Sequence, residues 1–111
     1  KGTFYEIDKD GNKSTRIVGD NYEVVAGSDF VNIKGTANLT IDSNCNTYIK
    51  GNWNIQVDGT KTEVVTGAVS ETYKSTKTEN VTGAVQETFS STQTTNVSSN
   101  VTITGSRIDL N

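Results

Sequence analysis

The sequence predicts an all-β fold in which extended strands are wound into a prism, and two observations lead to this prediction. Glycine recurs at intervals of eight residues along most of the chain. An apolar residue stands two positions before these glycines, so the repeating octad reads Val/Ile-x-Gly followed by five further residues. Eight residues are too few for a helical repeat, and the abundant Thr, Val and Ser favour strands.

The composition indicates that the chain cannot fill a core of its own. Only 32% of its 111 residues are apolar, whereas globular chains contain about 45–50%. Disorder is not favoured, because the chain has no Pro and is rich in β-branched residues. Strand formers without a sufficient core bury surface against neighbouring repeats or against other copies of the chain.

Charge and hydropathy exclude several classes of function. The formal net charge of −3 does not fit a nucleic-acid surface, which needs a basic stripe. We expect no transmembrane span and no signal peptide, and the first residues resemble a cut from a longer chain. Cys45 is the single cysteine and there is no His, so we expect a packed, inert thiol there.

The octad phase divides the chain into an N-terminal segment 1–10, an octad-repeat needle 11–104 and a C-terminal cap or tip segment 105–111. We expect a corner of the prism at each Gly slot, where Gly allows φ > 0 or the close approach of another chain. Ser occupies four of these slots. The predicted corners are Gly11, Gly19, Gly27, Gly35, Ser43, Gly51, Gly59, Gly67, Ser75, Gly83, Ser91 and Ser99.

The apolar position of each octad is predicted to face the core. Alternate residues of a strand point to opposite sides. We therefore expect the odd-numbered residues to face the interior of the prism (the dry parity) and the even-numbered residues to face solvent (the wet parity). The predicted core residues are Ile17, Val25, Ile33, Ile41, Ile49, Val57, Val65, Tyr73, Val81, Phe89 and Val97. Two neighbouring segments of the repeat, residues 63–78 and 79–94, are near copies that are identical at 11 of 16 positions. Each copy is two octads long.

Charged residues also occur on the dry parity. They are Lys61, Glu63, Glu71, Lys77, Glu79 and Glu87. Because unpaired charges are rarely buried, we expect them near the prism edges. There they would either pair with charges of other chains or face solvent, and the pattern leaves both readings open.

Periodicity alone does not say how many chains form the prism. One chain could return over itself after three octads, or three chains could wind together, each contributing one octad per face in rotation. A single-chain solenoid usually has caps and a filled interior, and this interior is thin.

The octads IVGDNYEV, VAGSDFVN, IKGTANLT, IKGNWNIQ, VDGTKTEV, VTGAVSET and VTGAVQET resemble the triple-stranded β-helix of the T-even bacteriophage cell-puncturing proteins, also called baseplate tail lysozymes. Similar needles occur in type VI secretion spikes. The stretch YEIDKDGNKSTRIVGDNYEVVAG resembles the start of such needles, and the resemblance covers about residues 5–104. The four Ser slots depart from the pattern and put the corner geometry there in doubt.

The resemblance implies an intertwined homotrimer in the hub or spike of the virion's tail baseplate, which pierces the host outer membrane. It also implies a PAAR-type tip protein at the C-terminal end, docked on Ile108, Leu110 and neighbouring residues. A frayed terminus is the alternative for this end. For the whole chain, the alternative function is a trimeric fibre or solenoid that binds cell-surface glycan, with Tyr22, Phe30 and Tyr48 on the wet parity.

No catalytic or metal-binding constellation is expected. The absence of His excludes a His-based triad, and the carboxylates fit solvated strand faces. Any lysozyme activity would belong to a parent chain outside this sequence. We expect no cofactor beyond adventitious ions in the axial core, and the stretch DKDGN at residues 8–12 predicts a turn rather than a calcium loop.

Overall fold

A computed structural model describes residues 2–111, so Lys1, the first residue of the predicted N-terminal segment, lies outside the described part. The chain divides into two units, Lys1–Gln56 and Val57–Asn111, and each is described by itself. The only strands in residues 2–111 are β1 (Phe4–Ile7) and β2 (Lys13–Arg16). The described backbone is otherwise extended and contains no helix, including none that could span a membrane.

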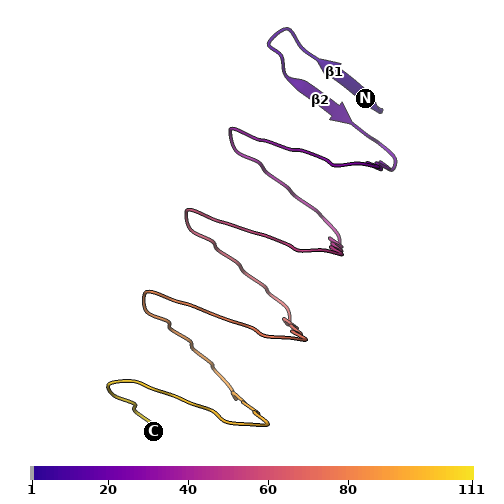
Figure 1. Cartoon of the computed structure of the whole chain (residues 1–111). Helices are drawn as coiled ribbons and strands as arrows, with labels where there is room; N and C mark the ends of the chain where they lie inside the picture. Colours follow the sequence, from indigo (N-terminus) through magenta and orange to yellow (C-terminus); the bar gives the residue numbers. More distant parts are fainter. Residues whose placement is uncertain (1) are drawn as a thin grey trace. The chain divides into compact units, whose positions relative to one another are not determined.

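The first unit begins with a hairpin (Figure 1). Strands β1 and β2 pair antiparallel, with Phe4 opposite Arg16 and Ile7 opposite Lys13. Lys13 Nζ lies 5.1 Å from the ring centroid of Tyr5, so a cation–π contact joins the two strands on one face. The backbone N–H of Val18 donates to Thr3 Oγ1 at 3.1 Å and holds the base of the hairpin to the following segment.

The turn of this hairpin is built around Asp8. Its Oδ1 accepts hydrogen bonds from the backbone N–H groups of Asp10 and Asn12, each at 2.9 Å, and its Oδ2 accepts one from Asn12 Nδ2 at 3.1 Å. Gly11 has a φ of 83° and donates its N–H to the Asp8 carbonyl. The predicted turn is therefore present, and Gly11 is a residue of this turn instead of the predicted prism corner, because its φ closes a hairpin.

From residue 17 onward, extended runs alternate with bends in each unit (Figure 1). The first bend covers residues 18–19, and later bends follow at intervals of eight residues through residues 98–99. Each bend comprises the residue of the Gly slot and the one before it. Ser43, Ser75, Ser91 and Ser99 bend the chain as the glycines do, so the Ser-for-Gly substitutions leave the bend intact.

The glycines at these bends do not adopt φ > 0. Among residues 2–111, positive φ occurs only at Gly2 and Gly11, so of the two reasons given for Gly at the later slots, a left-handed φ does not apply and close approach of another chain stays a prediction. The bend is made in ordinary regions of φ/ψ space, which Ser can also occupy. A Cβ added at any of the glycines from Gly19 to Gly83 would meet no atom of its own chain within 4 Å.

Neither unit buries a residue within the described part of the chain. The accessible surface of 12604 Å² is about twice the roughly 6,000 Å² of a compact monomer of this mass. The predicted core residues are thus all exposed in the isolated chain, because consecutive octads do not cover each other. Cys45, expected to be packed, is exposed as well.

We predict that Gly11→Ala will disrupt the hairpin, because an L-residue in the left-handed region costs about 1–2 kcal/mol. Cross-strand NOEs between Phe4 and Arg16, measured by NMR on the whole chain, should weaken or disappear. Asp10→Ala is the matched control, since its side chain bonds only to Lys9 at the surface. Equal NOEs in wild type and Gly11→Ala would contradict the role of Gly11.

The hairpin should also loosen in acid. The backbone N–H of Asn12, followed by its side-chain amide, holds the pKa of Asp8 below its ordinary value of 3.8. A carboxylate with a lowered pKa stabilises the fold above its ordinary pKa, and this stabilisation is lost as the pH falls through the lowered value. The amide shift of Asn12, whose N–H donates to Asp8 Oδ1, should therefore titrate at a pH below 3.8, and Asp8→Asn should abolish that titration.

Candidate assembly surface

Within each unit, the apolar residues two positions before the Gly slots form a stripe that the chain covers only in part. This apolar stripe comprises Ile17, Val25, Ile33, Ile41, Ile49, Val57, Val65, Tyr73, Val81, Phe89 and Val97, which are between 39% and 57% exposed. On the other parity, Tyr22 and Phe30 are 87% and 90% exposed. About half of the surface of each stripe residue is therefore available for contact.

The main chain of the octads is also unpaired. Between residues 17–55 and between residues 59–111, no backbone group hydrogen-bonds to another backbone group. Each extended run therefore presents unpaired N–H and C=O groups on both of its edges, as an edge strand does on one. Ordered backbone groups of this kind are normally paired with another strand once they leave water.

The open space beside the glycines agrees with these two features. Because no atom of the chain lies within 4 Å of the Cβ positions at Gly19–Gly83, the chain's own packing does not explain why Gly occupies these slots. Gly also permits the close approach of a second backbone. An apolar stripe, unpaired backbone edges and uncrowded glycines make this face the candidate surface for contact with other strands.

Four of the six charged residues of the dry parity pair along their own extended run. Lys61 Nζ lies 3.4 Å from Glu63 Oε2, and Lys77 Nζ lies 3.4 Å from Glu79 Oε1. The interaction with Glu79 raises the pKa of Lys77. Since all four side chains are largely exposed, each pair contributes little to stability in the isolated chain. Pairing between chains, one of the two readings from sequence, stays a prediction.

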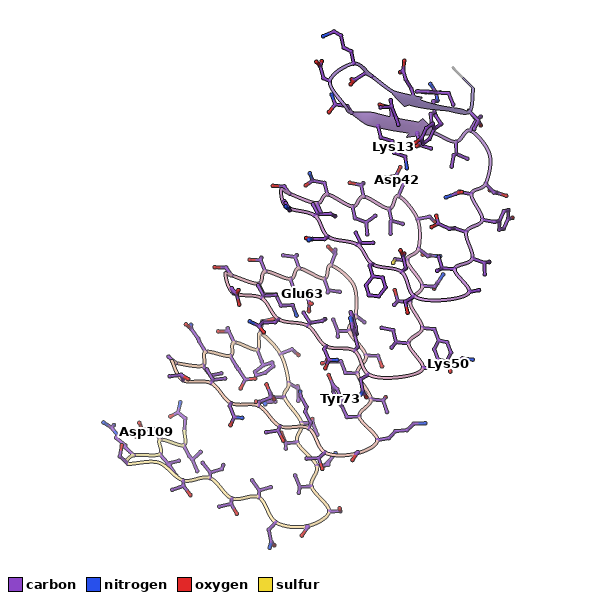
Figure 2. All side chains as sticks on the ribbon, turned by 45° about the horizontal axis from the view of Figure 1, so that its top comes forward. Lys13, Asp42, Lys50, Glu63, Tyr73 and Asp109 are labelled. Carbon is purple, nitrogen blue, oxygen red and sulfur yellow. The ribbon has the colours of Figure 1, made fainter. Side chains whose placement is uncertain are left out.

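Tyr73, the stripe residue of the first near copy, joins a small polar cluster (Figure 2). Its hydroxyl donates to Glu71 Oε2 at 2.8 Å, and Lys77 Nζ lies 5.1 Å from its ring centroid. The hydrogen bond to Glu71 and the negative charge of that carboxylate raise the pKa of Tyr73. The Lys-x-Glu and Glu-x-Tyr spacings are the sequence signals for these contacts, because residues two apart share a strand face.

The second near copy lacks this cluster. Phe89 and Gln93 stand where the first copy has Tyr73 and Lys77, and Thr95 follows the second copy where Glu79 follows the first. The hydroxyl, the ammonium and one carboxylate are therefore missing. Glu87 keeps the position of Glu71. No hydrogen bond or ion pair is formed by Glu87 with any of residues 2–111.

At the C-terminal end, the backbone bends at Ser106. A Cβ at Gly105 would lie 3.4 Å from the Arg107 carbonyl oxygen and 3.7 Å from Ile108 Cγ1. Arg107 Nε donates to Asp109 Oδ1 at 2.9 Å, and Asp109 is labelled in Figure 2. Of the two residues predicted to dock a tip protein, Ile108 is half-exposed and Leu110 is 90% exposed.

The described residues contain no pocket and no group of three or more His, Cys, Asp or Glu arranged to hold a metal ion. Cys45 Sγ lies 3.9 Å from Thr47 Oγ1 and has no thiol partner. The chemistry of this face is therefore that of strand edges, apolar side chains and a few charge pairs.

Comparison with known proteins gives a relation to a bacteriophage protein. Protein Gp5 of Vibrio phage KVP40 is 43% identical to this chain over 47 residues. The match covers 42% of this chain and 11% of that protein, so the chain spans a small part of its relative's length. No family model matches the sequence, and no solved structure matches it.

The polar cluster predicts a late-titrating tyrosine. In an absorbance titration, Tyr73→Phe should remove the phenol that ionises at the highest pH, and Glu71→Gln should move that ionisation to lower pH by removing the carboxylate that raises the pKa. Glu23→Gln, far along the sequence from Tyr73, is the control. Identical titration curves for wild type and Glu71→Gln would contradict the cluster.

Proposed function

We propose that three copies of this chain wind together into a parallel triple-stranded β-helix that serves as the puncturing needle of a contractile bacteriophage tail. The observation that carries the proposal is the set of regularly bent, extended octads, whose main chain makes no backbone–backbone hydrogen bond within residues 17–55 or within residues 59–111. The similarity to Gp5 of Vibrio phage KVP40 supports a structural role in a phage tail or baseplate.

A trimer would pair the backbone edges, cover the apolar stripe and use the open space at the Gly slots of each chain. If every chain contributes one octad to each face in rotation, two partner strands flank each octad and pair both of its edges. The exposed half of the apolar stripe then packs around the common axis. The Gly slots allow the three backbones to cross closely at the corners.

The resulting rod would suit a mechanical task. The eleven octads of residues 17–104 would advance by about 4.8 Å each and span roughly 50 Å, compared with about 30 Å for the hydrocarbon core of a bilayer. Interwound strands leave no lateral edge to fray. The driving force would come from the tail, and the needle would supply stiffness while it crosses the host outer membrane.

In this proposal the C-terminal segment 105–111 carries a PAAR-type tip protein, with Ile108 and the exposed Leu110 as apolar contacts. The needle itself has no catalytic role and needs no cofactor, and a lysozyme domain would belong to the longer parent chain. A glycan-binding fibre is the second candidate, favoured by the high exposure of Tyr22, Phe30 and Tyr48; a glycan array with Tyr22→Ala and Phe30→Ala tests it.

The oligomeric state tests the proposal directly. Light scattering on the whole chain should give a mass of three copies, and SDS gels run without boiling should retain a trimer band. A monodisperse monomer would rule out the triple-stranded helix. A trimer that binds glycan through the wet-parity aromatics would favour the fibre over the needle.

We predict that Gly67→Val will lower the melting temperature of the trimer, because the new side chain would crowd the partner backbones at a corner. Overpacking of this kind costs about 1–3 kcal/mol per chain. Thr72→Val is the matched control, because Val24 and Val64 hold the same octad position and surface changes stay within about 0.5 kcal/mol. In an isolated chain Gly67 has open space, so equal melting shifts for the two variants would contradict close approach at the corner.

A further inference from the structure

Four consecutive octads carry a glutamate at the same position, four residues after the Gly slot. They are Glu63, Glu71, Glu79 and Glu87, and together they are named the glutamate column. Lysine stands two residues before the first and third members, at Lys61 and Lys77. The other two octads have Val69 and Val85 there, so two lysines accompany four carboxylates.

The members of the glutamate column differ in their partners within the chain. Glu63 and Glu79 pair with lysines on their own strand, and Glu71 accepts the hydrogen bond from Tyr73. Only Glu87 has no partner among the described residues. Val85 stands where Glu63 and Glu79 have their lysine, and Phe89 lacks the hydroxyl that Tyr73 donates to Glu71.

The proposed trimer brings these carboxylates together, and the inference rests on that proposal. When identical octads rotate from face to face, octads that follow one another in sequence become neighbours on one face but belong to different chains. A residue then lies beside the residue eight positions later in a partner, about 4.8 Å away across the strands. Glutamates 63, 71, 79 and 87 would thus form a continuous ladder on every face.

We propose that the glutamate column makes the stability of the assembled trimer depend on pH, with Glu87 as its sensitive member. Glu87 would lie between Glu79 and Lys77 of one partner subunit and the uncharged Thr95 and Gln93 of the other. Its neighbours on its own strand are Val85 and Phe89. Because Lys77 already pairs with Glu79 at 3.4 Å, two carboxylates share one ammonium group, and like charges opposite each other destabilise a sheet.

Proton linkage gives the direction in which the stability of the trimer changes with pH. Assembly brings the carboxylates together, so the trimer binds protons more readily than separated chains do. Stability therefore rises as the pH falls through the range in which glutamate gains its proton. The needle would be held most firmly in mildly acidic surroundings and less firmly at neutral or higher pH.

Thermal melting of the whole chain at pH 7 and at pH 4.5, with the mass measured on each sample, tests this inference. Glu87→Gln replaces three charges per trimer and should raise the melting temperature at pH 7 by about 2–4 °C. The gain should shrink at pH 4.5 and in 1 M salt, where the screening length is about 3 Å. Glu23→Gln is the matched control, because Thr15 and Val31, eight residues to either side, carry no charge.

The outcomes separate this inference from the proposed needle. If the wild type is a trimer but Glu87→Gln gives no gain at pH 7, or the same gain at both pH values, the column is not pH-sensitive and the needle stands. If Glu23→Gln gives the same gain, the effect is one of net charge and the column is again excluded. If the protein is not a trimer, both the column and the needle are excluded.

Discussion

Unpaired main-chain hydrogen-bonding groups are the constraint on which the rest of this molecule depends. Between residues 17–55 and between residues 59–111, the backbone is ordered into extended runs, yet none of its groups bonds to another backbone group. A compact fold would satisfy these groups within the chain, but the bends that recur every eight residues separate each run from the next. The low apolar content follows from the same design, because the half-covered apolar stripe is too small to form a core within one chain. Assembly with other copies would complete both the hydrogen bonding and the core.

Much of the local structure could be predicted from the sequence, because it follows from steric preferences of single residues. The abundance of β-branched residues and the absence of Pro indicated an extended, helix-free backbone, which is confirmed for residues 2–111. The hairpin could not be predicted from the octad period, because Gly11 lies in phase with the later glycines although its φ of 83° serves a turn. The sequence also left two reasons open for the later glycines, because Gly can mark either an unusual φ or a need for space. The structure excludes the positive φ at these glycines.

The candidate surface was predictable at the level of the strand face but not of the individual contact. Parity placed Lys61, Glu63, Lys77 and Glu79 on the same face as the apolar stripe. Parity did not show that each lysine pairs along its own strand. A lysine in the pattern Lys-x-Glu can pair either with the glutamate two residues later or with a carboxylate of a partner strand. The cluster around Tyr73 was missed because Tyr73 had been assigned to the core, where its hydroxyl had no predicted role. Once Tyr73 is half-exposed at the stripe, the hydroxyl can bond to Glu71.

Near-identical octads allow the chains of a trimer to align in more than one register, and the residues that break the repeat can select one of these alignments. If one chain slips past its partners by sixteen residues, most of segment 63–78 meets a copy of itself, because 11 of 16 positions are identical in 79–94. Val and Gly would still fall at their usual positions, so neither the core nor the corners oppose the slip. The five differing positions do, and among them Lys77 and Gln93 decide which carboxylates meet an ammonium group. The hairpin of β1 and β2 opposes it as well, because a slipped chain would place a folded turn where its partners need an octad. In such an assembly the repeats supply the binding energy, and the exceptions to the repeat specify one alignment.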